Sequence, residues 1–230
     1  PCDLSGDCGG AARASDVRLS PLGSAFGALL HQRGMLPLHV SAVKAPTGVW
    51  AFTGASGEGK STLAGFLHRR FGWKLVSDDV SVVETDHSPA VVHPGPRKLK
   101  LWEDALEYLD LQNCRKVRDL SNTEKFQLYL PTESDYEPEP LHALVLLESA
   151  SEFCEPRIEM LKGSVSFSAC MESIYRPYMD CWFKVPERRM HELIQLCQQV
   201  QVYRFVRPRS LEGFEENLKP LSNLILSGKP

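Results

Sequence analysis

The stretch that decides the fold runs from Val49 to Leu67 and reads V-W-A-F-T-G-A-S-G-E-G-K-S-T-L-A-G-F-L. Its centre, Gly54 to Ser61, matches the phosphate-loop pattern G-x-x-x-x-G-K-[ST]. The apolar, β-prone residues before Gly54 predict a strand, and the apolar spacing over 61–70 predicts a helix. Strand, glycine turn and helix is the order that a phosphate loop (P-loop) requires. The sequence therefore predicts an α/β fold with a nucleotide site at this turn.

The glycines of such a loop let successive N–H groups point at one anion, and the helix N-terminus adds partial positive charge. We expect Lys60 to reach the β- and γ-phosphates of ATP and the Ser61 hydroxyl to bind Mg²⁺. The residues expected to contact the nucleotide are Ala55, Ser56, Gly57, Glu58, Gly59, Lys60, Ser61 and Thr62. The alternative is a glycine-rich turn before a helix, without a ligand.

Two adjacent carboxylates, Asp78 and Asp79, follow a helix stop at 71–73 and a β-prone run at 74–77. Strand ends are where α/β proteins place their chemistry. Successive strand residues point to opposite faces, so one carboxylate can hold Mg²⁺ or its water while the other acts as a general base. The alternation does not indicate which of the two aspartates binds the metal and which is the base. The alternative interpretation of the pair is a solvated turn without a catalytic role.

An alternating run at 36–43 predicts one more strand, joined to the strand before the P-loop by a hairpin turn at 45–48. His39 falls within this run and is expected beside the phosphate site. A single histidine in a strand is more often a structural residue than a functional one.

These three segments, in this order and with the Asp pair so soon after the P-loop, resemble the catalytic domain of HPr kinase/phosphorylase and its related serine kinases, including those of lasso peptide gene clusters. The family shares its nucleotide fold with phosphoenolpyruvate carboxykinase. The resemblance thus implies an α/β, HPr kinase/phosphoenolpyruvate-carboxykinase-like core with a mixed sheet and flanking helices. It also implies that Asp78 is the base toward a serine hydroxyl, that Asp79 helps to hold the metal with Ser61, and that His39 supports the site alongside Lys60.

The resemblance is strong over 35–84 and weaker afterwards, where 93–102 is similar to a stretch that leads into a helix, here 103–110. HPr kinases carry a Glu-x-Arg-Gly motif in this region, with the Glu as a metal ligand, and this chain has none. The 230 residues also include no separate N-terminal domain of the HPr enzyme. Both departures favour a related kinase, and the first puts the second metal contact and the phosphorylase activity in doubt.

The expected function is ATP- and Mg²⁺-dependent transfer of the γ-phosphoryl group to a serine of a peptide or small protein, with a lasso-type precursor peptide as one candidate. HPr kinase/phosphorylase itself and a small-molecule kinase are the nearest enzymatic alternatives. A nucleotide-binding regulatory module without transfer is the other class, and only a kinase needs the acceptor-facing carboxylate.

The composition and net charge of the chain limit the classes of partner that we expect. The chain is 43% hydrophobic with a net charge of −3 and a pI near 6.2, which gives no basic footprint for nucleic acid. No apolar run is long enough to cross a membrane, and a homo-oligomer is left open. The seven cysteines contain no C-x-x-C pair, which favours reduced thiols, mostly small core residues, in a cytoplasmic protein.

We expect residues 1–34 to form an N-terminal segment ending in a helix at 24–33, which truncation of a longer chain would explain, and 35–230 to form the kinase domain. Further helices are predicted at 186–197 and 211–226, and further strands at 141–148 and 200–206. The apolar run at 141–148 ends in Glu148 and could be a second acidic motif, but we interpret it as an ordinary core strand. The acidic, proline-rich stretch 131–140 is a solvated connector or a lid. The late basic candidates for the phosphate site are Arg176, Arg207 and Arg209.

Overall fold

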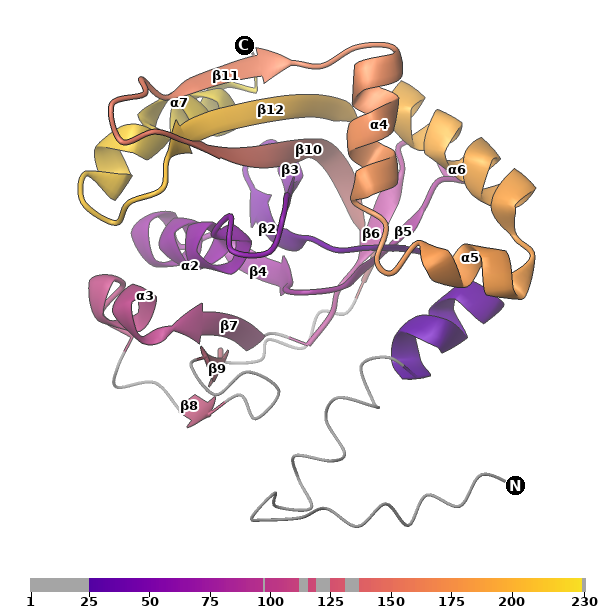
Figure 1. Ribbon diagram of the computed structural model, residues 1–230, viewed down its shortest axis with the longest axis horizontal. Coiled ribbons are helices and arrows are strands. Elements are labelled where there is room, and N and C mark those ends of the chain that lie inside the picture. The colour runs from indigo at the N-terminus through magenta and orange to yellow at the C-terminus, as the bar shows by residue number, and fades with distance from the viewer. Residues whose placement is uncertain (1–24, 97, 112–115, 119–124, 131–136, 229–230) are drawn as a thin grey trace.

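A computed structural model describes residues 25–96, 98–111, 116–118, 125–130 and 137–228. Among them, nine strands form one mixed sheet and a further three form a small antiparallel sheet. Helices lie on both faces of the large sheet (Figure 1). The predicted class, α/β with a mixed sheet and flanking helices, is confirmed.

The elements have the following bounds. The large sheet contains β1 (Leu36–Leu38), β2 (Ser41–Ala45), β3 (Gly48–Thr53), β4 (Lys74–Ser77), β5 (Ser81–Glu84), β6 (Val91–His93), β10 (Glu139–Ala150), β11 (Arg157–Met160) and β12 (Gln201–Pro208). The small sheet contains β7 (Lys98–Trp102), β8 (Lys116–Arg118) and β9 (Lys125–Tyr129). The helices are the segment 25–32, α2 (Lys60–Phe71), α3 (Glu103–Tyr108), α4 (Ser164–Glu172), α5 (Tyr178–Phe183), α6 (Pro186–Gln199) and α7 (Phe214–Ser227).

The strand directions bring three chain segments to one edge of the large sheet. Strand β10 pairs in parallel with β3 and with β12. Strand β2 is antiparallel to both β3 and β4, so β4 runs in the same direction as β3. The carboxyl ends of β3, β4 and β12 therefore meet at the same edge, where open α/β sheets bind ligands.

The predicted single strand at 36–43 is wrong. The chain forms two strands there, because β1 pairs with β5 whereas β2 pairs with β3 and β4. The backbone N–H of His39, at the break, donates to the carbonyl of Ser173 (2.6 Å). The alternation continues across the break because both strands are buried, so the pattern does not reveal the change of partner. The predicted hairpin at 45–48 is confirmed, with Ala45 opposite Gly48.

Alternate residues of β3 pack into two cores. Trp50 and Phe52 face the core that contains residues of α2 and α7, whereas Val49 and Ala51 face the core that contains residues of α4 and α6. A strand that is buried on both faces is typical of the centre of an α/β sheet. This packing fixes the end of β3, and hence the start of the P-loop.

Most other predicted elements are present. Helix α6 starts with Pro186 in its first turn. Strand β10 extends the strand predicted at 141–148 at both ends, whereas β12 begins one residue later than the strand predicted at 200–206 and runs to Pro208. Helix α7 begins at Phe214, later than predicted, and its apolar stripe is buried. Glu148 pairs with Arg204 (3.0 Å), as expected for a residue of an ordinary strand. Most of the predicted connector, 131–136, lies outside the described residues, and its last residues already belong to β10.

The described cysteines are unpaired by disulfides: Cys154, Cys170, Cys181 and Cys197. Cys170 is buried as predicted, but Cys181 is exposed, so the expectation of core thiols is wrong there. In the part of the chain that the structure describes, no helix has the length and apolar character needed to cross a membrane.

Candidate active site

The loop between β3 and α2 has the glycine-dependent conformation that its sequence predicts. Gly54, Gly57 and Gly59 have φ values of 143°, 92° and 77°. A Cβ atom at Gly54 would lie 2.7 Å from the carbonyl oxygen of Leu147 on β10, so this glycine is also required by close approach of the neighbouring strand. The predicted order of strand, glycine turn and helix is confirmed.

Lys60 begins α2 and its side chain folds back into the loop. Its ammonium donates to the carbonyl oxygens of Gly54 (2.8 Å) and Ala55 (3.1 Å). Burial lowers the pKa of Lys60, and the charge of Lys125 acts in the same direction while Asp78 opposes both. The cation is therefore held at the loop and has a carboxylate near it.

Asp78 follows the last residue of β4 and joins three elements. Its carboxylate accepts hydrogen bonds from the hydroxyls of Ser41 and Ser61, the latter at 2.8 Å, and from the backbone N–H of Lys100 (2.9 Å). Burial raises the pKa of Asp78, and the hydrogen bond from Ser41 opposes this most. Asp78, not Asp79, is thus the carboxylate in contact with the predicted metal ligand Ser61.

Asp79 has a different environment. Its backbone is left-handed, with φ of 79°, and this turns its side chain away from that of Asp78. The Asp79 carboxylate accepts from the Lys100 ammonium (2.9 Å) and lies 3.6 Å from Nε2 of His39. Burial alone would raise the pKa of Asp79, but the charge and hydrogen bond of Lys100 lower it below the ordinary value. The side chain is 37% exposed, so Asp79 is the accessible member of the pair.

His39 lies at the break between β1 and β2 and faces the same cavity. Its side chain is 39% exposed. Burial lowers the pKa of His39, and the charge of Lys60 lowers it further while Asp79 opposes. These effects shift the imidazole of His39 toward its neutral form. A neutral ring next to a carboxylate can donate or accept one hydrogen bond, depending on its tautomer.

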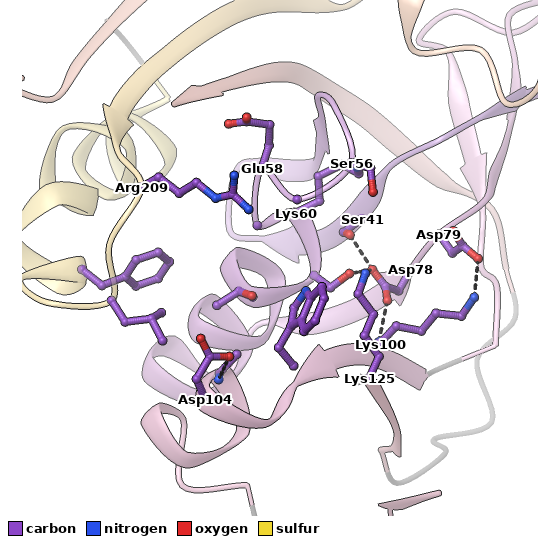
Figure 2. Close-up of a pocket in the computed structure, with 18 of the residues that line it drawn as sticks. Ser41, Ser56, Glu58, Lys60, Asp78, Asp79, Lys100, Asp104, Lys125 and Arg209 are labelled. Carbon is purple, nitrogen blue, oxygen red and sulfur yellow. Dashed lines mark hydrogen bonds and ion pairs between the residues drawn. The ribbon is translucent and has the colours of Figure 1, made fainter. Parts of the chain in front are cut away.

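One cavity of about 410 Å³ connects these groups. Its lining includes all the predicted site residues except Ala55, whose carbonyl holds Lys60. Figure 2 shows Asp78, Asp79, Lys100 and Lys125 on one side and Arg209 on the other. The polar and charged residues of the lining are His39, Ser41, Ser56, Glu58, Lys60, Ser61, Thr62, Asp78, Asp79, Lys100, Asp104, Lys125, Arg207, Arg209 and Ser210.

The late arginines differ in position. Arg207, at the end of β12, is buried and donates to the carbonyl of Glu58 (2.9 Å), so it supports the P-loop while also lining the cavity. Arg209 lines the cavity, and a Cβ atom added to Gly57 would meet its guanidinium at 3.0 Å. Arg176 is not among the lining residues and donates to the hydroxyl of Tyr178 (3.0 Å).

Several residues of the cavity were not predicted from the sequence, above all Lys100, Lys125 and Phe214. The alternation of Lys98, Lys100 and Trp102 with leucines does indicate a strand with one polar face. It carries no information about what that face adjoins. Strand β7 brings the ammonium of Lys100 to Asp79 (2.9 Å).

The residues present suit a magnesium nucleotide. Within the described residues, no group of three or more His, Cys, Asp and Glu side chains is arranged to hold a metal. Magnesium in nucleotide sites takes one or two carboxylates together with phosphate oxygens and water. Ser61 with Asp78, next to a loop that presents backbone N–H groups, is a donor set of this kind.

Comparison with known proteins found matches among solved structures only. No family model and no curated protein matches the sequence. Among solved structures, the chain is similar to the HPr(Ser) kinase/phosphatase from Coxiella burnetii, with 11% identity and a TM-score of 0.40. The similarity covers 84% of this chain and 97% of that one.

Proposed function

We propose that this chain is an ATP- and Mg²⁺-dependent phosphotransferase, a kinase that transfers the γ-phosphoryl group to a serine hydroxyl of a peptide or small protein. The observation that carries the proposal is the hydrogen bond between Ser61 and Asp78. It places a complete P-loop and a pair of carboxylates in one cavity. Nucleotide phosphates on the loop would lie directly beside the carboxylates.

The loop amides, Lys60 and Arg209 would bind the phosphates, and Thr62 would contact the nucleotide at the start of α2. Ser61 and Asp78 would hold Mg²⁺, directly or through water. The metal, when bound, neutralises charge on the β- and γ-phosphates. Arg207 would act through Glu58, whose carbonyl it holds, and Glu58 in turn accepts a hydrogen bond from Ser149 (2.6 Å).

The geometry favours an exchange of the roles that the family resemblance implies for the two aspartates. Both oxygens of Asp78 already accept hydrogen bonds, and the residue is buried beside Ser61. Asp79 is more exposed and faces His39. We therefore assign Asp78 to the metal side and Asp79 to the acceptor side. The raised pKa of Asp78 would make it the stronger base, but a loose transition state demands positioning of the hydroxyl more than removal of its proton.

In the proposed reaction, the serine oxygen forms a bond to the γ-phosphorus as the bond from that phosphorus to the β,γ-bridging oxygen breaks. The hydroxyl proton passes to Asp79 and then to solvent, and ADP leaves with the bridging oxygen. His39 would orient the Asp79 carboxylate. Its lowered pKa favours the neutral ring, so His39 adds little positive charge beside the ammonium groups of Lys60, Lys100 and Lys125.

The test uses ATP labelled at the γ-phosphate, with Mg²⁺ and serine-containing peptides, each paired with its alanine counterpart. We expect label on serine peptides only, slow release of labelled phosphate to water without peptide, and neither with Lys60→Ala. Binding of ATP with no transfer to peptide or water would instead support the regulatory module.

A small-molecule kinase is the second enzymatic candidate, because the cavity itself does not require a peptide. The same assay with free serine in place of the peptides separates the two. Transfer to free serine at a comparable kcat/KM would favour the small-molecule kinase.

A further inference from the structure

The small sheet forms the wall of the cavity opposite the P-loop. Strand β7 pairs with β9, and Trp102 lies directly opposite Lys125 in the register. The leucines of β7 pack against α2, where Gly65 leaves room for Leu99 and Leu101. This packing attaches the sheet to the same helix that begins with Lys60.

Lys125 projects into the cavity from this wall. Its ammonium lies 5.3 Å from the centre of the Trp102 ring, and its side chain is part of the cavity lining. Within the described residues, no carboxylate lies within ion-pair distance of it. An ammonium over an aromatic face is partly stabilised and keeps its N–H donors available for a further partner.

The other two lysines of the cavity have partners already. Lys60 donates to two loop carbonyls, and Lys100 donates to Asp79. The charge of Lys125 is nevertheless felt across the site. After burial, it is one of the causes that lower the pKa of Lys60 and of His39. Lys125 therefore adds positive potential to the space between the P-loop and the acceptor-side residues.

We propose that Lys125 contacts the γ-phosphoryl group of bound ATP and stabilises the charge on it during transfer, from the wall opposite the P-loop. This inference rests on the proposed function and adds a catalytic residue to it. A cation on the transferring group is the contribution that an arginine makes in other P-loop enzymes. Lys60 and Lys125 would hold the phosphates from opposite sides, and Lys100 would stay with Asp79.

Substitution of Lys125 should affect the binding of ATP and of ADP differently, because only ATP has the γ-phosphoryl group that Lys125 would contact. Calorimetry with the Mg²⁺ complexes of ADP and of β,γ-imido-ATP tests it without any acceptor. Lys125→Ala should weaken binding of the triphosphate analogue by about 10- to 100-fold, the range for loss of a hydrogen bond between ions, and ADP binding by less than about threefold. Lys125→Arg keeps the cation and should restore most of the difference.

Lys98→Ala is the matched control, since it removes a lysine from the same sheet but outside the cavity lining. It should leave the preference for the triphosphate unchanged. Thermal unfolding of each variant identifies any that is misfolded, and Lys125→Met, which preserves more of the packing on Trp102, replaces Lys125→Ala in that case.

Equal losses for the two nucleotides, or none for either, would overturn the role of Lys125. Failure of the wild-type chain to bind either nucleotide would instead overturn the proposed function, and this inference with it. With a labelled acceptor, Lys125→Ala should lower kcat by about a hundredfold or more, with little change in the KM for the acceptor.

Discussion

The Ser61 hydroxyl donates to the Asp78 carboxylate at 2.8 Å, across a separation of 17 residues in the chain. This contact joins the first turn of α2 to the end of β4. It is the basis of our proposal that the buried Asp78 lies on the metal side of the site and the more exposed Asp79 on the acceptor side.

Replacing Lys60 with Ala should weaken Mg-ATP binding by at least about a hundredfold, because the loop loses its own ammonium and the carbonyls of Gly54 and Ala55 lose their donor. Isothermal calorimetry measures the change. The control is Lys44→Ala, which removes an exposed lysine paired with Glu139 and should leave the affinity as it is. Unchanged ATP affinity in Lys60→Ala would refute the nucleotide site.

Ser61→Ala removes both a predicted metal ligand and a donor to Asp78. We expect the affinity for Mg-ATP to fall by about tenfold or more, while the affinity for ATP in the presence of a chelator changes little. Titrations with and without Mg²⁺ check this. Ser56→Ala, also in the loop but without contact to Asp78, is the comparison variant. Equal losses with and without metal would argue against Ser61 as a metal ligand.

Asp78→Asn and Asp79→Asn should fail in different ways. Asp78→Asn should raise the Mg²⁺ concentration needed for activity and should be partly rescued by excess metal. Asp79→Asn should bind Mg-ATP normally and lower transfer by about 10²- to 10⁴-fold, the range for loss of a general base. Initial rates as a function of Mg²⁺ distinguish the two. The opposite pattern would restore the roles that the family resemblance implies, and identical behaviour would mean a shared metal site.

Arg209→Ala should lower the rate of transfer by at least about tenfold, because Arg209 lies in the cavity beside Gly57 and can reach bound phosphates. Arg176→Ala is the natural control, since Arg176 lies outside the cavity and donates to Tyr178. A smaller effect at position 209 than at 176 would show that the late arginine is not part of the site.

A buried ion pair away from the site should control stability. Asp180 accepts from Nε of Arg189 (3.0 Å) and contacts Nδ1 of His31 (2.7 Å) in the helix at 25–32. Burial alone would raise the pKa of Asp180, but the hydrogen bonds from His31 and Arg189 lower it. Asp180→Asn removes one of the two carboxylates that pair with the buried Arg189, the other being that of Glu192. We expect a loss of about 1.5–3 kcal/mol in the free energy of unfolding, the range for a hydrogen bond to a charged group.

The lowered pKa of Asp180 makes the free energy of unfolding depend on pH. Because the folded-state pKa of Asp180 lies below the unfolded value, its carboxylate stabilises the fold above the ordinary Asp pKa. That contribution is lost as the pH falls through the folded pKa. The gap in stability between the wild-type chain and Asp180→Asn should therefore narrow in acid. Denaturant unfolding at several pH values measures it, with the exposed Asp86→Asn as the control.

The sequence by itself determined the local elements of the site. Glycines that need positive φ, a strand before them and a helix after them are local requirements, and they identify the P-loop without knowledge of the rest of the chain. Local signals also identify the end of β4, because Gly72 ends α2 and two aspartates follow the next strand. The apolar stripe of α7 was also predictable from its period.

Only the tertiary structure decided how these elements combine. The alternation around His39 is compatible with one strand or two, because partner strands are chosen by non-local pairing. The left-handed backbone of Asp79 and the hydrogen bond from Lys100 separate the two aspartates in a way that strand alternation could not specify. Lys125 reaches the cavity because β9 pairs with β7 and β7 packs on α2. A charge is read from sequence directly, but what it faces depends on contacts between residues far apart in the chain.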